Sequence, residues 1–362
     1  MLKTPFYDPH KSYEQNYDEG PFGSFADGAD LREDVEPIYD FLGFKINTPF
    51  GIPSGPLLNA KFCESAFKKG FDVLHYKTRR TVDFPCNPWP NILSVEVKGD
   101  LTLEKAQKPL IGTSNFDKDP KQFSITNSFG NPSPETKIWQ DDLKEAIKAE
   151  GKGQILIASV VGTIKEGFSS EDYYDDFALG AKLASDAGVK VLELNLSCPN
   201  VASEGILCYS KDAVVSICKK ARDVIGEVKL LIKIGYFSKD QQTLLEDIVK
   251  DVTPYIDGIS VINTIPAQVV DKSGEQALPG KGRLSSGICG ACIRWAGLDM
   301  VKRLNELRKS SDYDFVIVGV GGVMTAEDFL EYRNAGADIV QSATGAMWNP
   351  NLAIDIKKLD KK

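Results

Sequence analysis

Residues 230–264 read LLIKIGYFSKDQQTLLEDIVKDVTPYIDGISVINT, and this stretch decides the fold. Two short apolar runs, 230–236 and 258–264, flank a segment over 240–252 in which apolar residues recur at helical spacing. A strand, a helix and a second strand in this order form a βαβ unit, whose two strands run parallel. The stretch therefore predicts one repeat of a parallel α/β sheet.

The same alternation extends from about residue 50 to the C-terminal end of the chain. Eight strands are predicted, at 50–57, 71–78, 155–162, 189–197, 230–236, 258–264, 314–320 and 338–344. Helices are predicted at 61–70, 135–149, 171–187, 211–226, 240–252, 291–309, 325–336 and 350–359. The competing doubly wound sheet would need G-x-G-x-x-G after its first strand, where this chain has SGPLLNAKF. We therefore predict a single α/β domain over residues 1–362, a (β/α)8 TIM barrel.

Two segments lie outside the repeat. Residues 1–49 contain many acidic and aromatic residues without a period, and we expect an N-terminal extension that lies on the barrel as an arm or lid. Residues 79–134, rich in Pro and Asn, follow the second predicted strand where a helix would be expected. A loop this long in a compact domain is usually functional, so we predict an active-site insertion.

The composition excludes several classes of function. With 43 Lys and Arg against 51 Asp and Glu, the net charge is −8, which argues against a nucleic-acid partner. No apolar run is long enough to span a membrane and no leader pattern is present, so we expect a cytoplasmic protein without membrane contact. The seven cysteines are scattered, and we expect reduced thiols; Cys289 and Cys292 are predicted to be structural. The only histidines are His10 and His75, too few for a zinc site or a Ser–His nucleophile; no metal is expected, and His75 is predicted to be a barrel-core residue.

Polar residues end several of the predicted strands, and barrel active sites gather at these carboxyl ends. The fourth strand runs into Asn195-Leu196-Ser197-Cys198-Pro199-Asn200, which places a thiol between two carboxamides. Lys77-Thr78 and Asn263-Thr264 end the second and sixth strands. Lys233 lies inside the fifth strand, where a buried ammonium group requires an anionic or polar partner, so we predict an electron-rich ligand beside it.

Two glycine-bearing turns predict a phosphate site. Gly319-Val320-Gly321-Gly322 precedes the helix predicted from about residue 325, and Ser342-Ala343-Thr344-Gly345 ends the eighth strand. Many such barrels hold phosphate on the loops after strands seven and eight, where glycine lets the main chain approach the ligand closely.

These motifs together resemble the dihydroorotate dehydrogenases, particularly the soluble class 1 enzymes, over about residues 42–350. The matching stretches are Lys77-Thr78, Asn127-Ser128-Phe129-Gly130, Asn195 through Asn200, Lys233, Asn263-Thr264, Gly287 through Gly290, Gly321-Gly322 and Ala343-Thr344. The resemblance implies FMN as cofactor, oxidation of dihydroorotate to orotate in pyrimidine biosynthesis, and a homodimer that passes electrons to fumarate. It also implies that Cys198 is the general base at C5 of the substrate while C6 passes a hydride to the flavin.

The resemblance assigns the remaining site residues. The implied substrate contacts are Lys77, Asn127, Phe129, Gly130, Asn195, Asn200, Asn263 and Thr264. The implied FMN contacts are Ser54, Gly55, Lys77, Thr78, Ser159, Asn195, Lys233, Ile262, Gly287, Gly290, Gly321, Gly322, Ala343 and Thr344.

The sequence departs from the family pattern at two places. The family's substrate loop usually reads N-S-M-G-L-P-N, whereas this chain has Asn131 and Ser133 at the fifth and seventh positions, which leaves recognition of the orotate carboxylate open. After Gly290 the chain reads ACIRWAG where relatives often have Lys-Pro, which leaves the edge of the phosphate site open.

Two other functions remain as alternatives. One is another FMN-barrel reductase that acts on a related pyrimidine, either a dihydropyrimidine or dihydrouridine. Dihydrouridine synthases have a similar Asn-x-x-Cys-Pro turn, but the acidic net charge disfavours a tRNA substrate. A barrel that binds a phosphorylated ligand without catalysis would not account for the Cys, Lys and Asn residues at the strand ends. The electron acceptor stays open between fumarate, a quinone and NAD used through a partner protein.

Overall fold

Eight parallel strands close into a barrel in the computed structural model, which describes residues 5–117, 119–197 and 207–360. In order around the barrel they are β3 (Phe50–Ile52), β4 (Val73–His75), β8 (Ile155–Val160), β9 (Val191–Asn195), β10 (Lys229–Ile234), β11 (Gly258–Val261), β14 (Val316–Val320) and β15 (Ile339–Gln341). The last strand pairs with the first through Val340 and Phe50, which closes the ring. Each strand lies where the sequence predicts one, so the TIM barrel is confirmed.

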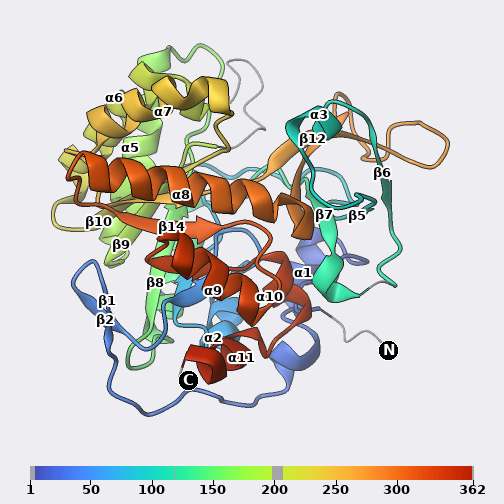
Figure 1. Cartoon of the computed structure of the whole chain (residues 1–362), viewed down its shortest axis with the longest axis horizontal. Coiled ribbons are helices and arrows are strands. Elements are labelled where there is room, and N and C mark those ends of the chain that lie inside the picture. Colours follow the sequence, from blue (N-terminus) through green and yellow to red (C-terminus); the bar gives the residue numbers. More distant parts are fainter. Residues whose placement is uncertain (1–4, 118, 198–206, 361–362) are drawn as a thin grey trace.

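Helices surround the barrel (Figure 1). They are α2 (Ala60–Lys68), α4 (Thr136–Lys148), α5 (Ser170–Asp186), α6 (Lys211–Ile225), α7 (Gln242–Val252), α8 (Arg294–Ser310), α9 (Ala326–Ala335), α10 (Thr344–Trp348) and α11 (Leu352–Asp360). Single 3₁₀ turns occur at Pro120–Gln122, Leu207–Tyr209, Lys239–Gln241 and Ala291–Ile293. In α7 the buried residues Leu245, Ile248, Val249 and Val252 recur at helical spacing, which is why this helix packs against the sheet. The eight predicted helices are confirmed to within a few residues.

The insertion is more than the loop that the sequence suggests, because it contributes to a second, smaller sheet. It supplies β5 (Ser94–Val95), β6 (Leu110–Thr113), β7 (Ser124–Asn127) and the short helix α3 (Leu103–Ala106). The segment after the sixth barrel strand adds β12 (Ile265–Val270) and β13 (Ser285–Gly290), and the five strands close in the order β12-β13-β7-β5-β6. Asn127 pairs with Gly287, so β7 delivers the Asn127–Gly130 stretch to the barrel at a fixed register.

The N-terminal extension has two parts that lie on different sides of the molecule (Figure 1). Residues 5–26, with α1 (Tyr13–Glu19) and the 3₁₀ turn η1 (Gly23–Ala26), form what we call the N-terminal arm. The hairpin of β1 (Tyr39–Phe41) and β2 (Phe44–Ile46) packs Phe41 and Ile46 against barrel residues. In the part of the chain that the structure describes, no helix has the length and apolarity to cross a membrane.

Gly51→Ala should lower the free energy of unfolding by about 3 kcal/mol, because a Cβ at Gly51 would lie 1.6 Å from the carbonyl oxygen of Val73 on the neighbouring strand. Gly180→Ala in α5 is the matched control: its Cβ would meet no heavy atom closer than 3.5 Å, and alanine favours a helix over glycine by about 1 kcal/mol. Urea unfolding followed by circular dichroism measures both variants. Wild-type stability in Gly51→Ala would contradict the close pairing of β3 with β4.

Candidate active site

A cavity opens where the barrel strands end, and it has two adjoining parts. The larger part, of about 750 Å³, contains Lys233 from β10 and the glycine turns that follow β14. The smaller part, of about 440 Å³, contains Lys77 and Asn195. The two parts share the lining residues Ser54, Gly55, Asn127, Phe129, Asn263 and Thr264. We therefore treat them as one candidate site.

Most of the residues predicted from the sequence line this site. They are Ser54, Gly55, Lys77, Thr78, Asn127, Phe129, Gly130, Asn195, Lys233, Asn263, Thr264, Gly290, Gly321, Gly322, Ala343 and Thr344. Cys198 and Asn200 lie outside the described residues. At the described end of the same turn, the Asn263 amide donates hydrogen bonds to Asn195 Oδ1 at 3.3 Å and to Ser197 Oγ at 3.0 Å. Carboxamides of two different strands are thus held together beside the cavity.

Three predicted cofactor contacts lie behind the lining residues instead. Ser159 Oγ lies 3.1 Å from Thr78 Oγ1. The Ile262 N–H donates to the Val320 carbonyl at 2.8 Å. A Cβ at Gly287 would lie 2.3 Å from Thr264 Oγ1, so the absence of a side chain leaves room for that threonine. These residues support side chains that face the cavity.

Three ionisable side chains are buried together inside the barrel below the cavity. Lys233 is 4% exposed, Glu193 on β9 is 1% exposed and His75 on β4 is 0% exposed. Glu193 Oε2 lies 3.2 Å from His75 Nε2, while Glu193 Oε1 accepts hydrogen bonds from Ser54 and Ser159. The negative charge that offsets the burial of Lys233 is that of Glu193, on the adjacent strand.

Burial and neighbouring charges have opposite effects on the pKa values of Glu193 and Lys233. Burial disfavours the charged form of Glu193, but the facing His75 and Lys233 outweigh it and lower the pKa to about 2. Burial also lowers the pKa of Lys233, against the opposing effect of Glu193. Gln341 contacts the other ring nitrogen of His75 at 2.8 Å, so His75 is a hydrogen-bonded core residue, as predicted.

Arginines bind the outer side of the loop that follows β7. Arg80 donates to the carbonyls of Gly130 at 3.1 Å and Asn131 at 3.0 Å, and Arg79 donates to the carbonyl of Pro132 at 3.4 Å. With these carbonyls held on one side, the N–H groups of Phe129 and Gly130 have no acceptor among the described residues. Successive N–H groups in such a turn can bind an anion.

Arg283, from the connection between β12 and β13, binds the same loop from another direction. Its guanidinium donates to the carbonyl of Ser128 at 3.1 Å and to Ser128 Oγ at 2.8 Å. It also donates to the carbonyl of Pro88 at 2.7 Å. One side chain therefore connects the small sheet, the insertion and the site loop.

Comparison with known proteins identifies the family. The family model described as dihydroorotate dehydrogenase matches residues 39–359. The chain belongs to the dihydroorotate dehydrogenase family. A dihydroorotate dehydrogenase of Dictyostelium discoideum is 35% identical, with 98% of this chain and 96% of that protein aligned.

A more distant relative supports placing the chain with the class 1 enzymes of the family, and a solved structure matches its fold. The catalytic subunit of a dihydroorotate dehydrogenase B (NAD(+)) from Petrotoga mobilis is 28% identical over 64% of this chain and 70% of its own length. The fold matches the crystal structure of an Eimeria tenella dihydroorotate dehydrogenase in complex with ferulenol, with a TM-score of 0.68 at 19% identity, covering 91% of this chain and 85% of that one. The predicted family and enzyme class, an oxidoreductase, are confirmed.

The two departures from the dihydroorotate dehydrogenase loop pattern have different structural meanings. Asn131 lines the smaller part of the cavity and has φ of 54°, a left-handed conformation that asparagine tolerates better than leucine. Ser133 does not line the cavity: its Oγ accepts from the Arg80 N–H and donates to the Pro134 carbonyl. Of the two changed residues, only Asn131 therefore lines the cavity.

Several lining residues were not predicted from the sequence. They are Tyr7, Pro53, Pro56, Ile92, Ile125, Thr126, Ile293, Val323, Met324 and Met347, together with Cys289, for which the sequence predicts only a structural role. Most are apolar, and an apolar residue carries no local signal that separates a cavity wall from a core. Glu193 was missed although it had a signal, a charge inside the apolar strand VLELN, of the same kind that identified Lys233.

Glu193→Gln should lower the free energy of unfolding at pH 7 by about 3 kcal/mol, because Lys233 would stay buried without its anion. The pKa of Glu193 is depressed from 4.5 to about 2 in the folded protein, so its contribution is complete above pH 4.5 and is lost as the pH falls from there toward 2. Urea unfolding between pH 7 and pH 3 should therefore show the gap between wild type and variant narrowing below about pH 4.5. If the difference in unfolding free energy did not change with pH, the proposed electrostatic effect of Glu193 on Lys233 would be contradicted. The control is Glu227→Gln, which changes an exposed carboxylate.

Arg283→Ala should accelerate amide hydrogen exchange about tenfold over residues 124–134, because the variant loses two hydrogen bonds from a charged donor to Ser128. Lys281→Ala removes a positive charge from an exposed position two residues away and should leave exchange unchanged. Mass spectrometry of peptic peptides gives the rates. Equal exchange in both variants would show that Arg283 does not hold the loop.

Proposed function

We propose that this chain oxidises dihydroorotate to orotate, with FMN held in the larger part of the cavity and the pyrimidine in the smaller part. The observation that carries the proposal is the convergence of Lys233, the glycine turns and four polar strand-end residues on one cavity, in a chain of the dihydroorotate dehydrogenase family. The four are Asn127, Asn195, Asn263 and Thr264.

The larger part of the cavity suits FMN in its chemistry. Gly321 and Gly322 have φ of 129° and 69°, and Ala343 and Thr344 follow the next strand, so main-chain amides are accessible to a phosphate. Lys233, in the same lining, supplies a cation that stabilises negative charge on a reduced ring system. When bound, FMN supplies the acceptor for a hydride.

The smaller part suits a flat pyrimidine that carries a carboxylate. Asn127, Asn195 and Asn263 can each donate and accept, which matches the alternating groups of an imide edge without adding charge. Lys77 and the N–H groups of Phe129 and Gly130 in the same lining favour a carboxylate. These contacts would orient the substrate and replace the water molecules that hydrate its polar groups.

For the proton at C5 we propose Cys198 as the general base, on the basis of the family motif that this sequence matches. A thiol has an ordinary pKa near 8.5, so it reaches its anionic form far more readily than a serine hydroxyl and needs no histidine. Asn195, three residues before Cys198 in the chain, lines the cavity. Ser197, one residue before Cys198, and Asn195 both accept hydrogen bonds from the amide of Asn263.

For the electron acceptor we propose fumarate, a small dicarboxylate that the same anion-binding groups can hold. Dihydroorotate dehydrogenase B relatives are named as NAD(+) enzymes with a catalytic subunit, so NAD(+) through a partner protein is the alternative. The homodimer and the cytoplasmic location stay predictions from the sequence.

An acceptor panel tests the activity. Purified protein is incubated with dihydroorotate and fumarate, NAD(+), a short-chain quinone or a redox dye, and orotate is measured by chromatography. We expect orotate with the dye and with fumarate. Orotate formed with the dye and with NAD(+), but not with fumarate, would make NAD(+) the acceptor in place of fumarate. No orotate with any acceptor would overturn the proposed activity.

Cys198→Ala should keep its flavin and lower orotate formation at least about a hundredfold, because a positioned base contributes on that scale. Cys198→Ser should retain a little activity that rises with pH as the hydroxyl becomes a better base. Cys218→Ala, which removes a buried thiol in α6, is the control for loss of a cysteine. Wild-type turnover by Cys198→Ala would remove Cys198 from the mechanism.

A further inference from the structure

The N-terminal arm, residues 5–26, lies outside the region that the family model matches, residues 39–359. Nevertheless Tyr7, near its start, lines the larger part of the cavity. We propose that the arm is a working part of the cofactor site: Tyr7 forms a wall of the FMN cavity, and the arm limits the rate at which the cofactor leaves. This inference rests on the FMN site proposed above.

The arm is fixed to the rim of the cavity by a main-chain hydrogen bond. The Phe6 N–H donates to the carbonyl of Met347 at 3.2 Å, and Met347 is itself a lining residue of the cavity. The Phe22 N–H in turn donates to the Phe6 carbonyl at 3.0 Å, which closes the arm on itself. The residue next to Tyr7 is thus bonded directly to the cavity rim.

Aromatic packing holds the arm in this position. The buried Phe6 ring lies 4.4 Å from the Phe25 ring of the same arm and 6.2 Å from the Phe62 ring of α2, measured between centroids. Burying an aromatic side chain of this kind contributes about 2 kcal/mol. The arm therefore has an apolar anchor in the barrel shell and is not a loose tail.

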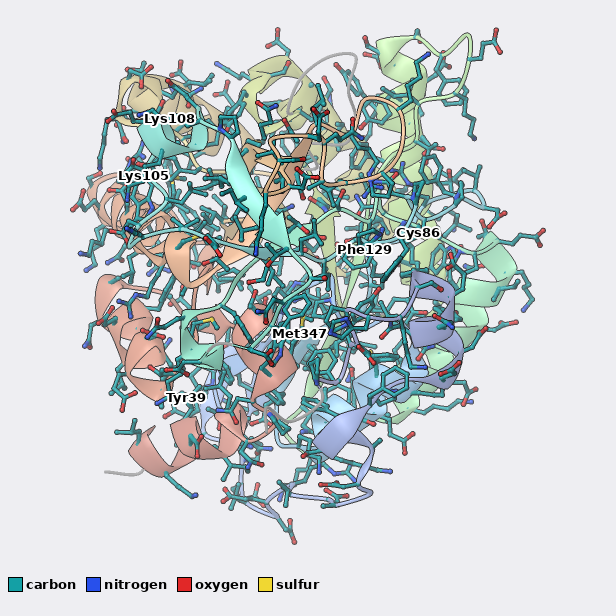
Figure 2. All side chains as sticks on the ribbon, turned by 90° about the vertical axis from the view of Figure 1, so that its right-hand side faces the viewer. Tyr39, Cys86, Lys105, Lys108, Phe129 and Met347 are labelled. Carbon is teal, nitrogen blue, oxygen red and sulfur yellow. The ribbon has the colours of Figure 1, made fainter. Side chains whose placement is uncertain are left out.

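Tyr7 also contacts the loop that would bind the substrate. Its ring meets Phe129 edge-on at 5.5 Å, and Phe129 lines both parts of the cavity. Tyr13 packs on the same Phe129 ring at 6.1 Å. Figure 2 shows Phe129 and Met347, the two lining residues that the arm contacts, near the middle of the face on which the insertion lies. The arm thus bridges one wall of the cofactor cavity and the site loop.

The Tyr7 hydroxyl is an additional sign that the arm belongs to a binding site. Tyr7 is 2% exposed, yet its hydroxyl has no hydrogen-bond partner among the described residues. Leaving a buried polar group unsatisfied costs about 1–3 kcal/mol, which a core position filled for packing alone would avoid with phenylalanine. A polar ligand atom or an ordered water in the cavity would satisfy it.

The chain offers a matched control in the same N-terminal extension. Tyr39 lies in the β1–β2 hairpin, which Figure 1 places on another side of the barrel, and Figure 2 shows it well apart from Phe129 and Met347. Tyr39→Ala removes the same side chain from the same extension without touching the cavity.

The test is FMN release. Apoprotein of wild type, Tyr7→Ala, Tyr7→Phe and Tyr39→Ala is reloaded with FMN, and dissociation is followed by the recovery of free-flavin fluorescence. We expect Tyr7→Ala to release FMN at least about tenfold faster than wild type, a change that corresponds to about 1.4 kcal/mol of cofactor binding. Tyr39→Ala should release FMN at the wild-type rate. Tyr7→Phe keeps the wall and should release FMN less than threefold faster.

A second measurement keeps the inference testable if Tyr7→Ala does not fold. In the wild-type protein, FMN should slow amide hydrogen exchange in peptides covering residues 5–9 and leave the hairpin peptides at 39–46 unchanged. Unchanged FMN release in Tyr7→Ala, or unchanged exchange in the arm when FMN binds, would overturn the role of the arm while leaving the proposed function intact. Failure of the wild-type apoprotein to bind FMN at all would instead overturn the proposed cofactor.

Discussion

The burial of the Glu193 carboxylate beside His75, where its charge also offsets the burial of Lys233, is the interaction on which the rest of the site depends. Burying an ammonium group inside a β-barrel costs desolvation free energy unless an anion lies near it. Glu193 on the next strand provides that anion. Ser54 and Ser159 bind the same carboxylate, so three strand regions of the barrel are tied to one charge. Lys233 can then face the cavity while the barrel below it stays closed.

Above this charge cluster, three segments outside the βα repeat shape the cavity: the insertion, the segment after β11 and the N-terminal arm. The small sheet delivers Asn127 at the end of β7, and arginines from two sides hold the following loop by its carbonyls. The N-terminal arm closes another side through Tyr7 and its contact with Phe129. The barrel supplies the charged floor and the glycine turns, while the segments outside the βα repeat supply the walls.

Much of this arrangement could be predicted from the sequence because it depends on local signals. Buried strands and amphipathic helices have a clear period, so each barrel element was placed to within a few residues. Strand-end residues such as Lys77, Asn195 and Thr264 stood out because polar groups there interrupt apolar runs. The glycine turn at Gly321-Gly322 stood out for its conformational freedom.

The rest depends on contacts between distant residues, which one sequence does not reveal. The strands of the small sheet have only two to six residues, and two of their pairings, β12 with β6 and β13 with β7, join positions more than a hundred residues apart, so the sequence predicts a loop for the insertion. Arg79, Arg80 and Arg283 act through main-chain carbonyls, and nothing in their own sequence neighbourhoods points to that use. Tyr7 was expected only as part of an arm or lid, since its place in the cavity wall follows from how the arm folds back.

The central claim is that electrons from dihydroorotate enter a flavin held in this cavity, and an anaerobic titration tests it most directly. Purified protein is titrated with dihydroorotate while the visible flavin absorbance is recorded and orotate is quantified. The account predicts a yellow protein whose absorbance bleaches with one orotate formed per flavin. A protein that binds no flavin after reconstitution, or a bound flavin that keeps its colour in excess dihydroorotate, would contradict it.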